Sequence, residues 1–136
     1  MLEFNTTKDL ISLSDLQNLE SALGAILPED YKTHMLKYNG GRVSWTKSYI
    51  LEYNGSEYEL GGFKELDKLK FFFESKNPIL YPKYFSFGDI EGGYLAMGYQ
   101  EENYGQIFVY FSDEAPQKVA NSFSEFLQSI KVVNEE

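Results

Sequence analysis

Leucines repeat at helical spacing early in the chain, between Leu16 and Leu23. A capping-box pair, Ser14 and Gln17, precedes them, and Gly24 follows. Such a pair satisfies free amides at the start of a helix, and glycine favours the left-handed backbone that ends one. The pattern therefore predicts a first helix with one apolar face turned toward a core.

Two further helices are predicted in the first half of the chain. The second begins at Pro28, which suits the first turn of a helix, and ends before Asn39. The third runs from about Lys64 to Ser75. It ends before Pro78, because a proline disfavours the helical conformation of the residue that precedes it.

The clearest helical pattern lies near the C-terminal end. Ser122 and Glu125 repeat the capping-box pattern. Apolar residues then follow at i, i+3, i+4 and i+7, namely Phe123, Phe126, Leu127 and Ile130. This predicts a last helix that packs on the rest of the domain. We expect the residues from Val132 to Glu136 to fray.

Aromatic and β-branched residues dominate positions 43–60, where Asn54-Gly55 separates two short runs. This residue pair is typical of tight hairpin turns, so a strand is expected on each side of it. Three more strands are predicted at Tyr84–Gly88, Tyr94–Tyr99 and Gln106–Phe111. Their connections are short enough for an antiparallel meander.

Alternation along these three strands assigns their side chains to two faces of the sheet. The face expected to form the core carries Phe85, Phe87, Leu95, Met97, Ile107, Val109 and Phe111. The second face carries Tyr84, Ser86, Tyr94, Ala96, Phe108 and Tyr110. Together the elements predict an α+β fold, in which helices from both ends of the chain pack against a mostly antiparallel sheet.

The composition is that of one globular domain. The chain has 136 residues, a hydrophobic fraction of 43%, eleven tyrosines and eleven phenylalanines. Compact domains run to roughly 100–150 residues, so we expect residues 1–136 to form a single domain. The absence of cysteine excludes disulfides, thiolate metal sites and cysteine nucleophiles. Nothing in the sequence predicts the oligomeric state.

Charge limits the classes of partner. Twenty-one acidic and twelve basic residues give a net charge of -9, which repels phosphate backbones and anionic lipids. We therefore expect no nucleic-acid partner and no membrane binding. The first nine residues lack the basic and apolar regions of a secretory signal, so we expect a cytoplasmic protein. Solubility alone accounts for this charge as readily as attraction to a basic partner does.

Several short motifs occur in a set order along nearly the whole chain. They are Glu20 with Leu23-Gly24, Leu27-Pro28-Glu29-Asp30-Tyr31-Lys32, Asn39-Gly40-Gly41, Phe87-Gly88-Asp89 with Gly92-Gly93, Gly105-Gln106-Ile107-Phe108 and Ala120-Asn121-Ser122-Phe123-Ser124-Glu125-Phe126-Leu127. In this order the chain resembles the SUKH superfamily, which includes yeast cell-wall assembly regulators and many bacterial immunity proteins. The resemblance implies an α+β domain and, in bacteria, neutralisation of a toxin by direct binding. The motifs are mostly turns and caps, so they identify the scaffold better than the binding site.

Candidate catalytic groups are few. The single histidine, His34, is expected on the surface of the second helix or partly packed, and no Gly-x-Ser-x-Gly motif accompanies it. We expect no enzyme activity, no metal and no cofactor, because the chain also lacks an EF-hand loop and a histidine pair.

Two chemical alternatives stay open. Two of the acids Asp89, Glu91, Glu101 and Glu102 form a glycosidase pair if their spacing in the fold suits it. The glycine doublets Gly40-Gly41, Gly61-Gly62 and Gly92-Gly93 are expected to be turns. Gly61-Gly62 is expected between a strand and a helix, where an anion site is the second alternative.

From Tyr84 through Gln117 the chain has no lysine or arginine, and it has six acids. In a meander the loops after the first and third strands lie at one end of the sheet. The acids expected at that end are Asp89, Glu91, Asp113 and Glu114, while Glu101 and Glu102 are expected at the other end. We interpret the acidic end as a surface that steers association with a basic partner, and solvated loops with no such role are the alternative.

Tyrosines suit the anchors of a protein interface, because each combines a large apolar area with a polar tip. The candidates are Tyr84, Tyr94 and Tyr110, unless helices cover both faces of the sheet and turn them into core. The resemblance to the SUKH superfamily implies an immunity protein that binds and neutralises a cognate toxin, and the acidic end leads us to expect that this toxin has a basic surface. A regulatory scaffold of the cell-wall-regulator type, or a carbohydrate-binding or carbohydrate-processing domain, are the alternatives.

Overall fold

The structure is a computed structural model that describes residues 2–6, 8–44, 46–112 and 114–134. Within these ranges the helices are α1 (Leu13–Leu23), α2 (Glu29–Tyr38), α3 (Leu66–Glu74) and α4 (Phe123–Ser129), with a short 3₁₀ helix η1 (Glu101–Asn103). The strands are β1 (Gly41–Arg42), β2 (Lys47–Tyr53), β3 (Ser56–Phe63), β4 (Tyr84–Ile90), β5 (Gly93–Gly98), β6 (Ile107–Tyr110), β7 (Gln117–Ala120) and β8 (Lys131–Asn134).

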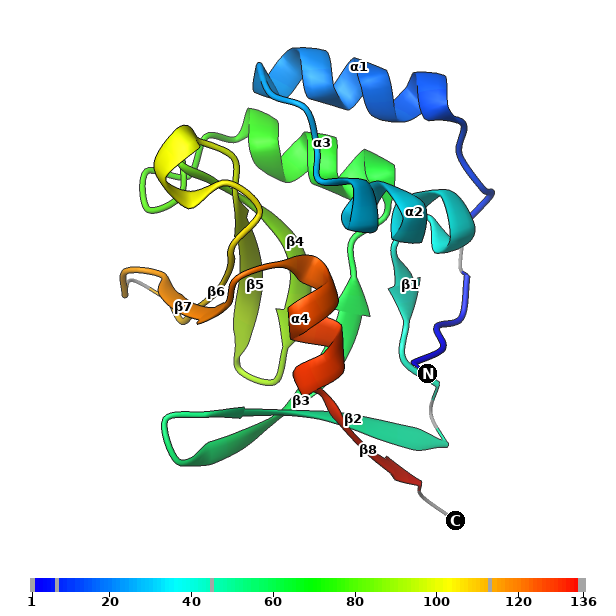
Figure 1. Ribbon diagram of the computed structural model, residues 1–136, viewed down its shortest axis with the longest axis vertical. Coiled ribbons are helices and arrows are strands. Elements are labelled where there is room, and N and C mark those ends of the chain that lie inside the picture. Colours follow the sequence, from blue (N-terminus) through cyan, green and yellow to red (C-terminus); the bar gives the residue numbers. More distant parts are fainter. Residues whose placement is uncertain (1, 7, 45, 113, 135–136) are drawn as a thin grey trace.

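These strands form one antiparallel sheet in the order β7-β6-β5-β4-β3-β2-β8, and β1 pairs with β3 outside this path. The predicted meander is β4-β5-β6, and Asn54-Gly55 forms the turn between β2 and β3. The β2–β3 hairpin lies at one end of the molecule, and α1, α2 and α3 group at the other end (Figure 1). The predicted α+β fold is confirmed, with helices from both ends of the chain packed on the sheet.

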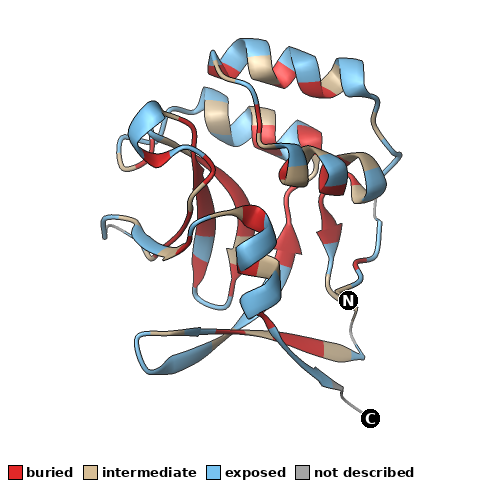
Figure 2. Ribbon diagram, viewed as in Figure 1, coloured by how far each residue is buried: buried red, intermediate tan, exposed pale blue. Residues whose placement is uncertain are grey.

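One face of the meander forms the core, as the alternation predicts. Six of its seven predicted residues are buried, and Phe111 is half-buried. The ring of Phe87 lies 5.7 Å from that of Tyr31 in α2 and 6.0 Å from that of Phe123 in α4. Figure 2 shows buried residues on the strands of the sheet and on the helices that lie beside it. Packed aromatic rings therefore hold α2 and α4 to this face.

The helix termini differ in detail from the predicted ones. The capping box of α1 is formed by Ser12 and Asp15, not by Ser14 and Gln17. Both pairs have the same spacing in the sequence. Only the position at which the helical backbone begins shows which of the two pairs caps the helix. Pro28 is the residue before α2 rather than its first residue, and Asn39 ends that helix in the left-handed conformation with φ of 46°.

Gly61-Gly62 is not the turn that the sequence predicts, because both residues lie inside β3. A Cβ atom at residue 62 would lie 2.6 Å from the carbonyl oxygen of Gly41, and φ at this position is 147°. Glycine therefore allows β1 and β3 to approach closely here. The doublet forms no loop before α3, so the anion site suggested there is wrong in its placement.

We predicted that the C-terminal residues from Val132 onward fray. This is wrong for the described part of that segment, because β8 pairs with β2 along Lys131–Asn134. The N-terminal segment reaches the same strand, since the Tyr49 hydroxyl donates to the carbonyl oxygen of Glu3 and accepts from its backbone amide, both at 2.8 Å. Strand β2 thus holds both ends of the described chain.

Candidate partner-binding surface

The β4–β5 turn and the connection after β6 lie at the same end of the sheet, as the meander predicts. Glu91 and Glu114, which come from these two segments, line one hollow, and both are exposed. Glu101 and Glu102 are exposed in η1, which follows the opposite end of β5. Asp113 lies outside the described residues. The fold thus brings together two of the four acids expected at this end.

Asp89 has a different environment from the one expected. Its carboxylate Oδ1 lies 3.3 Å from Nζ of Lys64, the residue after β3. The side chain of Lys64 is only 3% exposed, and that of Asp89 is 38% exposed. The charge of Asp89 is therefore offset within the fold, and its pairing was not predicted because 25 residues separate the two positions.

Lys64 is the centre of a polar cluster beneath the second face of the sheet. Its Nζ donates to Ser86 Oγ at 2.8 Å and lies 4.8 Å and 5.4 Å from the ring centres of Phe72 and Tyr94. Burial lowers the pKa of the Lys64 ammonium, and the charge of Asp89 opposes that shift. Hydrogen bonds and ring faces thus surround a cation that water scarcely reaches.

Of the three candidate tyrosines, only Tyr94 is exposed, at 42%. Its ring stacks on that of Tyr110, with centres 5.3 Å apart and planes 26° apart. Tyr110 is buried, and this burial raises the pKa of its hydroxyl. Tyr84 is half-buried and meets the ring of Phe108 edge-on at 4.8 Å. Tyr84 and Tyr110 therefore support the face, while Tyr94 can reach a partner directly.

The apolar cluster on the second face contains no residue of a described helix. In it, Ile79 and Leu80, from the segment before β4, pack against Phe108 and Tyr110. Phe72 of α3 adds a second exposed aromatic ring, 43% exposed, on the other side of Lys64. Phe72 was not predicted as a surface residue. The run of phenylalanines at 71–73 leaves the helical period ambiguous, because all three positions are apolar.

His34 is not on the helix surface, because it is 7% exposed within the aromatic core. Its Nε2 lies 2.7 Å from the carbonyl oxygen of Gly40, an arrangement in which the neutral ring donates a hydrogen bond. Four rings surround it, from Phe4, Tyr38, Phe63 and Phe123. Burial lowers the pKa of His34 to about 4, so the ring is neutral near pH 7.

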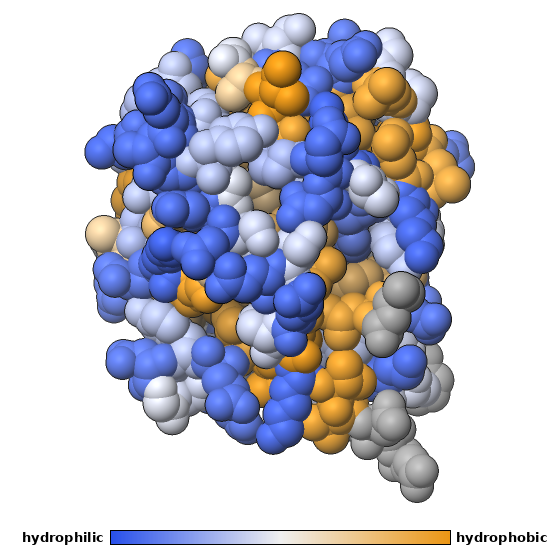
Figure 3. All heavy atoms as spheres, viewed as in Figure 1, coloured by the Kyte–Doolittle hydropathy of each residue, from blue (hydrophilic) through white to orange (hydrophobic). Residues whose placement is uncertain are grey.

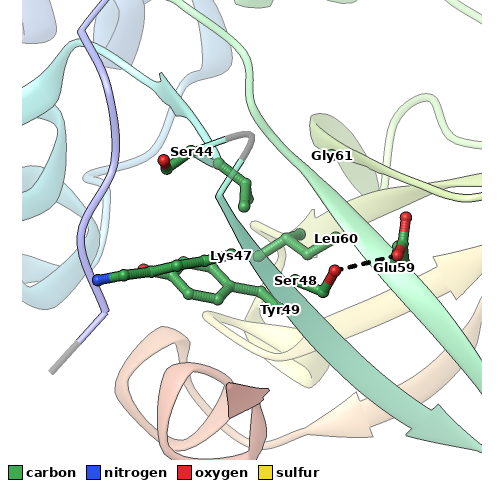
Figure 4. A pocket seen from close by; sticks show the side chains of 8 residues that line it. Ser44, Lys47, Ser48, Tyr49, Glu59, Leu60 and Gly61 are labelled. Atoms are coloured by element: carbon green, nitrogen blue, oxygen red, sulfur yellow. Dashed lines mark hydrogen bonds between the residues drawn. The ribbon is translucent and has the colours of Figure 1, made fainter. Parts of the chain in front are cut away.

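A polar hollow opens between β2 and β3 (Figure 4). Its lining includes Lys47, Ser48 and Glu59, and Ser48 Oγ donates to Glu59 Oε1 at 3.2 Å. Lys47 Nζ lies 3.9 Å from a carboxylate oxygen of Glu3. These polar groups therefore contact one another or the N-terminal segment. Such mutual pairing is typical of groups that stabilise the fold and does not point to a ligand.

A second, more apolar hollow lies beside α4. Leu2, Leu127, Ile130 and Val132 contribute to its lining. Figure 3 shows apolar side chains gathered on this face of the molecule, next to the chain ends. Apolar patches of this kind occur at interfaces, so this hollow is the competing location for partner contact.

The described residues contain no group of three or more histidine, aspartate or glutamate side chains arranged to hold a metal ion. They also contain no helix with the length and apolar character needed to cross a bilayer.

No curated protein matches the chain. The model of the family described as SMI1 / KNR4 family (SUKH-1) matches residues 10–129, which includes all four helices and the meander.

Proposed function

We propose, because the chain belongs to the SMI1/KNR4 family (SUKH-1), that it neutralises a cognate toxin protein by binding it directly. The family includes toxin immunity proteins and cell-wall regulators. In this proposal the protein acts in the cytoplasm, without catalysis and without a cofactor. Its partner-binding surface is the end of the sheet around Tyr94.

The observation that carries this proposal is the support beneath Tyr94. Its ring is exposed, yet it stacks on buried Tyr110 and lies over buried Lys64. An anchor held in place before binding loses little conformational freedom when a partner covers it. Phe72 widens the same surface with a second exposed ring. Buried aromatic anchors of this kind contribute most of the affinity at protein interfaces.

The charge of the same end of the sheet supports a basic partner. Glu91 and Glu114 are exposed there, and the segment from Tyr84 through Gln117 has no lysine or arginine. Opposite charge accelerates encounter more than it strengthens the final complex. The net charge of -9 adds to this long-range attraction at low ionic strength.

The environment of His34 supports action by binding rather than by catalysis. A general base must reach its substrate, whereas the His34 ring is enclosed by aromatic side chains and held by Gly40. Its lowered pKa of about 4 also makes it a weak base near neutral pH.

The first test is capture followed by protection. The tagged chain is expressed in its native host, and a protein that it captures is identified and expressed alone in a test strain. If that protein kills the strain, we expect co-expression of the chain to restore growth. We expect Tyr94→Ala to weaken capture and protection by roughly ten-fold or more, as truncation of an interface anchor does.

Tyr104→Ala is the matched control, because Tyr104 is 45% exposed and follows η1 at the opposite end of β5. It should leave protection unchanged. Val132→Glu places a charge in the apolar hollow beside α4. Loss of protection in this variant, with Tyr94→Ala fully active, would show that the partner binds elsewhere. A captured protein that is not toxic would contradict the proposed function itself.

A further inference from the structure

A hollow at the acidic end of the sheet combines aromatic walls with carboxylates. It lies between the tip of the β2–β3 hairpin and the loops that follow β4 and β6. The hairpin tip extends to this side of the sheet in Figure 1. The aromatic residues that line it are Tyr53, Tyr58 and Phe111, and its polar residues are Asn54, Glu91, Glu114 and Gln117.

The three rings form a connected wall. The centres of Tyr58 and Phe111 lie 5.3 Å apart, and those of Tyr53 and Tyr58 lie 6.5 Å apart. All three side chains are half-buried, so each is held by the fold and still has exposed area. Val109 is buried behind them at the base of the hollow.

The two carboxylates of the hollow have no cation beside them among the described residues. Neither Glu91 nor Glu114 forms an ion pair there, and the described lining contains no lysine or arginine. Glu91 Oε1 accepts one long hydrogen bond, of 3.4 Å, from the backbone amide of Glu59. Two negative charges thus flank an aromatic wall without compensation.

We propose that this hollow binds the guanidinium group of an arginine side chain from the partner protein. A guanidinium is planar and cationic, so it stacks on aromatic rings and forms paired hydrogen bonds with a carboxylate. The rings of Tyr58 and Phe111 provide the stacking surface, and Glu91 and Glu114 provide the acceptors. The arginine is the partner's, so this proposal rests on the proposed function and names the chemistry that the partner presents.

The test uses a small probe and needs no toxin. N-acetyl-arginine amide is titrated into the full chain, and backbone amide shifts are followed by NMR. We expect saturable shifts at Tyr58, Gly92 and Gln117, which surround the hollow. N-acetyl-citrulline amide has the same shape without the charge, and N-acetyl-lysine amide has a cation without the planar group. Both should bind more weakly than the arginine compound.

Variants then assign the contacts. We expect Glu91→Gln and Glu114→Gln each to weaken binding by roughly two- to five-fold, as for exposed ion pairs. The matched control is Glu101→Gln with Glu102→Gln, which removes two exposed carboxylates at the opposite end of β5 and should change nothing. Tyr58→Leu should weaken binding, whereas Tyr58→Phe keeps the ring and should not.

Several results would overturn the proposal. These are shifts spread over the whole acidic surface, equal binding of the citrulline or lysine compound, or an equal effect of the control variant. Its failure is distinguishable from failure of the proposed function, because protection of cells by the chain is measured without the probe. A chain that protects cells but does not bind the arginine compound would contradict only the proposal that the hollow binds a guanidinium group.

Discussion

Nζ of Lys64 lies 3.3 Å from Oδ1 of Asp89, and the two side chains differ sharply in exposure, at 3% and 38%. The pair therefore links the start of α3 to strand β4 through one buried and one solvated group. Removal of one partner from such a pair is costly when the remaining charge stays buried. The two single substitutions should consequently differ.

We expect Asp89→Asn to lower the free energy of unfolding by about 1 to 3 kcal/mol, because it leaves the Lys64 cation buried without its counter-charge. Lys64→Met should cost less than about 1 kcal/mol, since it removes the buried charge and leaves Asp89 accessible to water. Urea denaturation of the two variants and the natural chain measures the difference. Equal losses would mean that the cost comes from the lost interaction itself and not from a buried ammonium left without its counter-charge.

Two buried tyrosines should respond oppositely to loss of the hydroxyl group. The Tyr31 hydroxyl is buried and has no hydrogen-bond partner within the described residues, and burial raises its pKa. The Tyr49 hydroxyl has two partners on Glu3. We expect Tyr31→Phe to raise the free energy of unfolding by about 1 kcal/mol and Tyr49→Phe to lower it by about the same amount. A loss in Tyr31→Phe would reveal a partner for that hydroxyl, such as a buried water.

His34 should make the chain less stable in acid. Its pKa is about 4 in the folded chain and near 6.5 when unfolded, so the unfolded chain binds more protons between these values. The stabilisation is complete above pH 6.5 and is lost as the pH falls through 4. The loss amounts to about 2 to 3 kcal/mol.

Comparison with His34→Gln isolates this contribution, because Gln can still donate to Gly40 and does not titrate. Every other pH-dependent contribution to stability is present in both chains and cancels in the comparison. We expect the variant to gain about 2 kcal/mol relative to the natural chain between pH 7 and pH 4. Denaturation curves that move in parallel at both pH values would place the His34 pKa near its ordinary value.

Adjacent glycines of β3 should differ in their tolerance of alanine. At Gly62 a Cβ would lie 2.6 Å from the Gly41 carbonyl oxygen, whereas at Gly61 the nearest atom would lie 3.4 Å away, on Asp89. We expect Gly62→Ala to destabilise the fold by about 2 kcal/mol or more. Gly61→Ala should cost well under half of that. Similar thermal midpoints for the two variants would show that β1 can move away from β3.

Electrostatic steering predicts a rate effect. In the proposed complex, Glu91→Gln with Glu114→Gln should slow association by roughly three-fold or more at low salt and flatten its dependence on salt. The same substitutions at Glu101 and Glu102 serve as the control. Stopped-flow mixing with the captured partner at several salt concentrations measures both. Dissociation rates should change less than association rates. An unchanged salt dependence would show that the acidic end does not steer association with the partner.

The long, periodic elements could be predicted from the sequence, and the short ones could not. The helices near Leu16, Pro28 and Phe123, the Asn54-Gly55 hairpin and the meander have patterns that span several residues. Strands β1, β7 and β8 have two to four residues each and, unlike β6, they lie in segments without a longer alternating run of apolar residues. These strands form because they pair with the backbone of neighbouring strands of the sheet. Such pairing between distant segments leaves no local signal in the sequence.

The candidate surface was predicted only in part, because its remaining features depend on contacts between residues that are far apart in the sequence. Alternation placed Tyr94 and Tyr110 on one face correctly, but it could not show that one is exposed and the other buried beneath it. Charge counting treated Asp89 as a free acid. It missed Lys64, because an isolated lysine after a strand gives no sign of burial in the sequence.

Strand β2 has a practical consequence for the design of fusions. Its Lys47 end lies opposite Asn134, and its Tyr53 end borders the aromatic hollow. Six residues of extended chain span roughly 20 Å, so Asn134 pairs with the end of β2 that lies away from the hollow. Tyr49, to which Glu3 is tied, lies in the half of the strand nearer Lys47. Reporter proteins or surface linkers can therefore be attached at either terminus while the hollow and Tyr94 remain open to a binding partner.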